Sequence, residues 1–126
     1  MTVGRRAARR TAFFLLYQWD LTGQPLGSLY EGEIDPYARE LAEGVAARAA
    51  ELDDSITAAA TDWPAGRLGT VERNVLRIAV HELDRGLVPV EVAVDEAVRL
   101  AKRYATEEAA RLVNGILGRI VRERAA

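Results

Sequence analysis

The sequence TVERNVLRIAVHELDR, residues 70–85, is the clearest indication of how this chain folds. Its apolar residues recur at helical spacing and cover most of a helix circumference: Val71, Val75, Leu76, Ile78, Ala79, Val80 and Leu83. A helix that is apolar on nearly every side needs other helices around it. We therefore predict a buried central helix here, with Thr70 as its N-terminal cap.

Helical spacing also recurs on both sides of this stretch, whereas hairpin dipeptides and sustained period-two runs are absent. Residues 23–34 are rich in turn-forming residues and are expected to form a loop. The other predicted helices cover residues 4–21, residues 35–49 beginning at Asp35-Pro36, a short segment from a cap at Asp53 or Asp54 to about residue 61, residues 91–105, and the residues after a cap at Thr106. The pattern indicates an all-α protein.

Length and composition fit one globular domain. The chain has 126 residues, of which 49% are hydrophobic. It contains no cysteine, which excludes disulfides and thiolate metal sites. Neither a signal peptide nor an apolar run long enough to span a bilayer is recognisable. We therefore expect a single-domain cytoplasmic protein that does not associate with a membrane.

The sequence offers little of the chemistry that an enzyme needs. The single histidine, His81, belongs to no HExxH pair and is interpreted as a structural residue on the polar edge of the central helix. Asp95 and Glu96 are adjacent, so their side chains point in different directions and do not form a catalytic pair. Phosphate-binding glycine loops are absent. We expect no catalytic residues, no metal site and no cofactor.

The charge of the chain is unevenly distributed, although the net charge is only −2. Residues 1–19 hold four arginines and no acid, residues 20–96 hold sixteen acids against six bases, and residues 97–126 hold seven bases against three acids. Two basic ends allow a mildly acidic protein to bind a polyanion, because binding depends on the charge of the contacting patch and not on the net charge. The alternative is that the basic ends are solvated arms.

The first predicted helix carries the most specific sign of a ligand. Four arginines lie within six residues: Arg5, Arg6, Arg9 and Arg10. Phe13 and Tyr17 continue the face of Arg6 and Arg10 at helical spacing. Cations for phosphates together with rings for unstacked bases are typical of single-stranded RNA binding. We predict that the four arginines lie off the core stripe and contact RNA together with Tyr17, whereas Phe13 belongs at least in part to the core.

Four stretches of the chain resemble one known family. They are RRAARRTAFFLLYQWD (residues 5–20), VERNVLRIAVHEL (residues 71–83), VPVEVAVDEAVRLAKRY (residues 88–104) and VNGILGRI (residues 113–120). In this order and with these gaps, they are similar to the motifs of the NusB family of transcription antitermination factors. The resemblance covers nearly the whole chain.

The resemblance implies a compact bundle of about six to seven helices in two small halves, with residues 1–126 as a single RNA-binding domain. It also implies a transcription antitermination factor that binds the boxA element of nascent ribosomal RNA leaders together with NusE, a small-subunit ribosomal protein, within an RNA polymerase antitermination complex. Carried over position by position, the RNA contacts are Arg5, Arg6, Arg9, Tyr17, Arg77 and Arg111, and the contact with NusE is Glu72. Leu112 stands where the family often has phenylalanine, which leaves a stacking contact there open.

Two other functions stay open at this point. A similar helical domain precedes a catalytic domain in some ribosomal RNA methyltransferases, although this chain has no βαβ segment for their cofactor. The second alternative is a helical scaffold that binds only protein. The sequence also leaves open whether the free protein is a monomer or a homodimer.

Overall fold

The computed structural model describes residues 4–61 and 68–125, and within them it is all-helical, as the sequence predicts. The elements are α1 (Arg5–Thr22), the 3-10 helix η1 (Leu26–Leu29), α2 (Pro36–Ala47), α3 (Ala49–Ala59), α4 (Thr70–Arg85), α5 (Val90–Tyr104) and α6 (Glu107–Ala125). In these two segments no helix is both long and apolar enough to cross a membrane.

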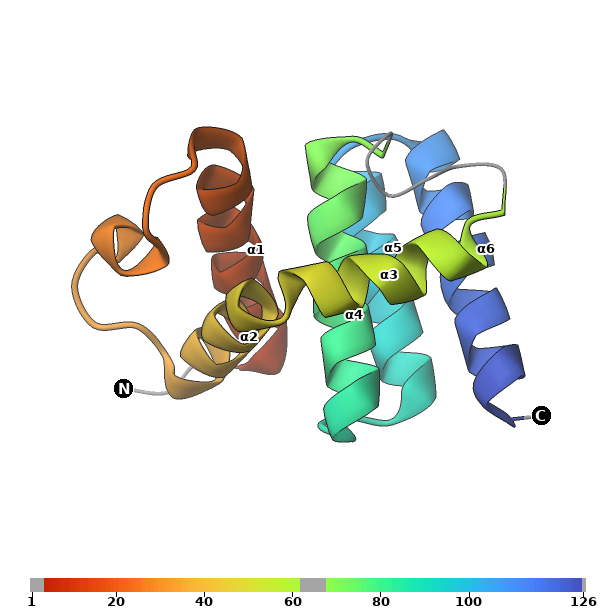
Figure 1. The fold of residues 1–126 in the computed structure, drawn as a ribbon. Coiled ribbons are helices and arrows are strands. Elements are labelled where there is room, and N and C mark those ends of the chain that lie inside the picture. The colour runs from red at the N-terminus through yellow and green to blue at the C-terminus, as the bar shows by residue number, and fades with distance from the viewer. Residues whose placement is uncertain (1–3, 62–67, 126) are drawn as a thin grey trace.

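The helices form two groups (Figure 1). The first contains α1, η1 and α2, and the second contains α4, α5 and α6 running alongside one another, with α3 lying across α4 toward α6. Helix α4 packs against each of the other five α-helices, and every residue from Asn74 to Glu82 is buried. The prediction of a buried central helix is confirmed.

Several helix ends follow from local chemistry. The Asp35 carboxylate accepts hydrogen bonds from the backbone N–H groups of Tyr37 and Ala38, and Thr106 Oγ1 accepts one from Ala109. Gly23 and Gly86 follow α1 and α4 with positive φ angles of 73° and 61°, which only glycine adopts without strain. The caps predicted at Asp35 and Thr106 are confirmed.

Two other predicted caps are wrong. Helix α2 ends at Ala47 and helix α3 begins at Ala49, so Asp53 and Asp54 lie inside α3. Arg48 alone separates the two helices, and no glycine or proline marks the break. The N-cap of α4 is Gly69, whose N–H donates to the Glu72 carboxylate, and Thr70 is its first helical residue. The turn signals at residues 63–66 lie outside the described residues.

The sequence predicts His81 on the polar edge of α4, and this prediction is wrong. His81 is fully buried. The reason is the close approach of α2, where Gly44 has no side chain. A Cβ atom at Gly44 would lie 2.5 Å from the imidazole ring of His81. The ring is held by Arg48 Nη1, 2.9 Å from Nδ1, and by Glu40 Oε1, 3.4 Å from Nε2. His81 therefore joins α2 to α4, which is the structural role expected of it.

Candidate nucleic-acid interface

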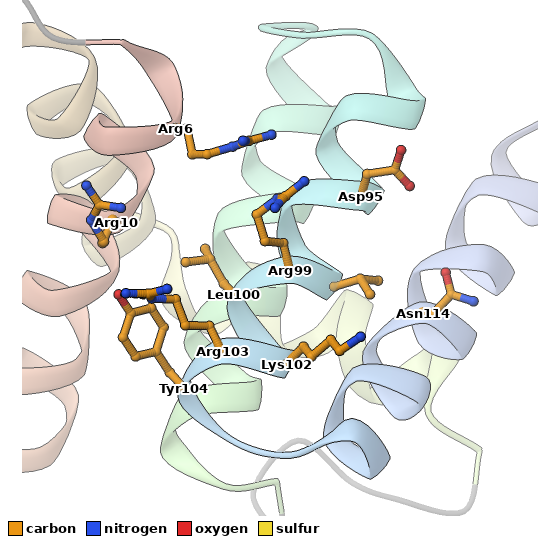
Figure 2. Close-up of a pocket in the computed structure, with 10 residues that line it drawn as sticks. Arg6, Arg10, Asp95, Arg99, Leu100, Lys102, Arg103, Tyr104 and Asn114 are labelled. Atoms are coloured by element: carbon orange, nitrogen blue, oxygen red, sulfur yellow. Dashed lines mark hydrogen bonds between the residues drawn. The ribbon is translucent and has the colours of Figure 1, made fainter.

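A cationic groove of about 720 Å³ lies between α1 and α5 and reaches α6 (Figure 2). Its lining combines five cations with one acid: Arg6, Arg10, Arg99, Lys102 and Arg103 with Asp95, together with Val98, Leu100, Tyr104 and Asn114. The spacing explains why these cations meet. Positions three or four apart share a helix face, as Arg6 and Arg10 do on α1 and Arg99 and Arg103 on α5.

The cations of the groove differ in how firmly they are held. Arg6 and Arg99 each donate from Nε to the carboxylate of Glu96, at 2.9 and 3.1 Å. Arg103 donates to Tyr104 Oη at 3.2 Å, with its guanidinium 5.6 Å from the centre of that ring. Arg10 is exposed and forms no ion pair with any acid of residues 4–61 and 68–125. The groove therefore presents guanidinium groups that a phosphate can reach.

An aromatic cluster adjoins one end of this groove. Tyr104 of α5 stacks on Phe13 with a centroid separation of 5.3 Å and meets Phe14 edge-on at 5.2 Å. Phe13 also contacts Tyr17 at 6.1 Å. These four rings and Val71 line a second hollow of about 190 Å³. Tyr104 lines both hollows, so rings and cations form one continuous surface.

Tyr17 and Phe13 differ in exposure within that cluster. Phe13 is 2% exposed and belongs to the core, as expected, while Tyr17 is half-buried and packs against the core. Phe14, which the sequence analysis did not single out, is 43% exposed. The ring of Phe14 is therefore more open to a ligand than that of Tyr17.

Arg9 is buried, and the prediction that all four arginines of α1 lie off the core is wrong for this residue. Its side chain is 4% exposed, its Nε lies 3.0 Å from one Glu82 oxygen and its Nη1 lies 3.4 Å from Glu96 Oε1. Tyr37 donates its hydroxyl proton to the same Glu82 carboxylate. Burial, together with this hydrogen bond, raises the pKa of Tyr37 to about 12. Arg9 therefore joins α1 to α4 and α5 inside the protein.

Arg77 is also an internal residue. It is 6% exposed and makes two hydrogen bonds to Asp53, at 2.8 and 2.7 Å, and one to Asp20 at 3.2 Å. It thereby ties α4 to α3 and α1. In this conformation neither Arg9 nor Arg77 is presented to a ligand.

The remaining predicted site residues occupy three different places. Arg5 is exposed, lies 4.1 Å above the Tyr37 ring and donates to the Leu87 carbonyl. Arg111 lines a hollow of about 350 Å³ between the end of α3 and α6, which is separate from the cationic groove. Glu72 caps α4 through Gly69. The structure thus brings only Arg6 and Arg10 of the predicted arginines into one groove.

Sequence reasoning missed the contribution of α5. Arg99, Lys102 and Arg103 belong to the basic stretch of residues 97–126, so the excess charge was visible. The position of these residues opposite α1 was not visible in the sequence, because it depends on how the helices pack. The spacing of these three residues on one helix face was the available signal.

The fold and this surface define a class of protein: a small all-α protein with an open cationic and aromatic face. The NusB family model matches residues 6–122, and the chain belongs to the NusB family. The transcription antitermination protein NusB of Rubrobacter xylanophilus is 43% identical over 122 residues, which cover 91% of this chain and 88% of that protein.

Solved structures agree with this assignment. The structure of T. maritima NusB superposes with a TM-score of 0.86 at 35% identity, covering 98% of this chain and 94% of that one. A crystal structure of antitermination factors NusB and NusE in complex with double-stranded RNA gives a TM-score of 0.82 at 33% identity, covering 94% and 96% of the two chains.

Proposed function

We propose that this protein is a transcription antitermination factor that binds boxA-type RNA of nascent ribosomal RNA leaders together with NusE. In this role it joins an RNA polymerase antitermination complex in the cytoplasm and acts by binding, without catalysis. The observation that carries the proposal is the groove between α1 and α5, where five cations converge beside an aromatic cluster. Membership of the NusB family, and the NusB structure that contains NusE and RNA, support the same function.

The proposed contacts divide by chemistry. Arg6, Arg10, Arg99, Lys102 and Arg103 would hold the phosphates of the RNA, because guanidinium and ammonium groups neutralise phosphate charge. Arg5 and Arg111 are exposed and are further candidates outside the groove. Tyr17 stays a candidate for base contact. Arg9 and Arg77 would act from inside, by fixing the helices that carry the exposed cations.

A binding assay tests the proposed function. The protein is titrated into a single-stranded boxA-type RNA, a scrambled RNA of the same composition and a double-stranded RNA, each with and without NusE. We expect tighter binding to the boxA-type strand than to the scrambled strand, and a further gain with NusE. A protein that binds NusE but none of the RNAs would instead be the protein-only scaffold.

A further inference from the structure

The carboxylate of Glu96 contacts arginines from both walls of the cationic groove, Arg6 of α1 and Arg99 of α5. Its Oε1 accepts from Arg6 Nε at 2.9 Å and lies 3.4 Å from Arg9 Nη1, while its Oε2 accepts from Arg99 Nε at 3.1 Å. Glu96 itself is only 7% exposed, whereas the side chains of Arg6 and Arg99 are 62% and 58% exposed. One buried carboxylate thus joins two exposed guanidinium groups.

The choice of nitrogen atoms matters for what the two exposed arginines can still bind. Both Arg6 and Arg99 use Nε for Glu96, and a guanidinium has four further N–H groups on its Nη atoms. Those paired Nη donors are one edge of the fork that binds a phosphate in a bidentate manner. Glu96 therefore restrains each side chain and leaves donors available for a ligand.

The charge of this cluster supports the same role. Burial by itself would raise the pKa of Glu96, but the hydrogen bond and charge of Arg6, the charge of Arg9 and the hydrogen bond of Arg99 lower it below its usual value. Glu96 therefore stays ionised at neutral pH. With one negative charge between Arg6 and Arg99, the pair still presents a net positive charge to the groove.

We propose that Glu96 is a positioning residue, which holds Arg6 of α1 and Arg99 of α5 in a converging arrangement ready for RNA phosphates. This inference rests on the proposed RNA-binding function. It runs against simple electrostatics, in which an acid beneath a phosphate site only weakens binding. The preorganisation removes part of the entropy that two long side chains would otherwise lose on binding.

The neighbouring acid provides a matched control. Asp95 also lines the groove, is exposed and forms no ion pair with any base of residues 4–61 and 68–125. Asp95→Asn and Glu96→Gln each remove one negative charge from the same turn of α5, beside the cations of the groove. Simple electrostatics therefore predicts tighter RNA binding for both variants, and the positioning role predicts opposite effects.

The experiment measures affinity for the single-stranded boxA-type RNA at several salt concentrations, below the melting temperature of each variant. We expect Asp95→Asn to bind more tightly than the unaltered protein. Glu96→Gln should bind about tenfold more weakly, as expected when one charge-assisted hydrogen bond to the RNA is removed. Its log–log salt slope should fall by about 0.7 for each phosphate that is no longer neutralised. Glu96→Asp keeps the charge but shortens the side chain, and should also weaken binding.

Coupling between Glu96 and Arg6 gives the second readout. In an Arg6→Ala background, Glu96→Gln should have a clearly smaller effect on RNA affinity than in the unaltered protein. Equally tighter RNA binding by Glu96→Gln and Asp95→Asn, or additive effects of Glu96→Gln and Arg6→Ala, would overturn the positioning role and leave the proposed RNA-binding function standing. An unaltered protein that binds no RNA would overturn the proposed function and this inference with it.

Discussion

Neighbouring arginines on α1 have different environments because successive helical residues are about 100° apart. Arg9 points into the protein and pairs with Glu82 and Glu96, whereas Arg10 lines the open groove. A buried charge that loses its partner is costly, but an exposed charge without an ion pair contributes little to stability. The two residues therefore separate folding from ligand binding.

Replacing each of these arginines by alanine tests that separation. Arg9→Ala leaves Glu82 without its cation in a buried site, so we expect a loss of about 3–5 kcal/mol in the free energy of unfolding. Arg10→Ala should change stability by less than about 0.5 kcal/mol and weaken RNA binding. Urea denaturation and RNA titration of the same two proteins provide the measurements. An Arg9→Ala protein as stable as the unaltered one would contradict the buried role.

The titration of His81 makes the stability of the protein depend on pH. Burial lowers the pKa of the ring, its hydrogen bond to Glu40 offsets part of that effect, and the charge of Arg48 lowers the pKa further. The folded protein therefore keeps His81 neutral in a pH range where the same histidine is protonated in the unfolded chain. The stabilisation is fully present above the unfolded pKa of about 6.5 and is lost as the pH falls below it.

We expect the free energy of unfolding to decrease between pH 6.5 and pH 5, with a slope of up to about 1.4 kcal/mol per pH unit. His81→Gln should flatten this dependence, whatever its own stability, because His81 is the single histidine of the chain. Denaturation at several pH values measures both slopes. The same slope in both proteins would show that another group is responsible.

At the scale of the elements, two glycines in helix interiors have opposite surroundings. A Cβ atom at Gly44 of α2 would meet the His81 ring at 2.5 Å, while one at Gly115 of α6 would meet nothing within 4 Å. Alanine favours a helix over glycine by about 1 kcal/mol. Helical propensity alone therefore predicts that both Gly→Ala substitutions stabilise the protein.

Packing predicts that the two substitutions change the melting temperature in opposite directions. Gly44→Ala should lower the melting temperature, because separating α2 from α4 costs about 1–3 kcal/mol and exceeds the gain in propensity. Gly115→Ala should raise it slightly. Thermal melting of both variants, followed by circular dichroism, distinguishes the expectation from packing from the expectation from helical propensity. Stabilisation by Gly44→Ala would mean that α2 and α4 pack less closely than described.

Glu72 at the start of α4 connects helix capping with the proposed partner. Its carboxylate accepts the Gly69 N–H at 3.2 Å, and glutamine can accept the same bond without the charge. We expect Glu72→Gln to fold with nearly unchanged stability and to associate more slowly with NusE, which we expect to be basic. Glu72→Lys should bind NusE more weakly still and lose about 0.3–1 kcal/mol at the helix N-terminus.

Association kinetics with NusE, and RNA titration of the same variants, give the measurement. RNA binding in the absence of NusE should change much less. If both substitutions leave the association rate unchanged, Glu72 is only a cap.

Across the whole molecule, the sequence predicts the helices well because their apolar spacing and several of their caps are local. The central position of α4 follows from apolar residues around most of its circumference. The break at Arg48 could not be predicted, because it depends on bonds to residues elsewhere in the chain, including Asp84 of α4. The same limit applies to Gly44, whose importance depends on the ring of His81.

The candidate site was only partly predictable for the same reason. The arginines of α1 were found from composition and spacing, but their sorting into buried Arg9 and exposed Arg10 depends on where Glu82 and Glu96 lie. The cations of α5 become part of the site only because that helix, packed on α4 and α6, faces α1 across the groove. Charge along the chain indicates a polyanion ligand, and tertiary packing decides which charges face it.

If RNA binds in the groove between α1 and α5, the salt dependence of its affinity should depend on the cations of that groove. Arg10→Ala with Arg103→Ala removes two charges from the groove, and Arg39→Ala with Arg85→Ala removes two exposed charges elsewhere. We predict that the groove pair lowers the log–log salt slope for single-stranded RNA by about 1.4, or 0.7 for each phosphate, and that the control pair leaves it nearly unchanged. Equal slopes for the two double variants would mean that RNA does not bind in this groove.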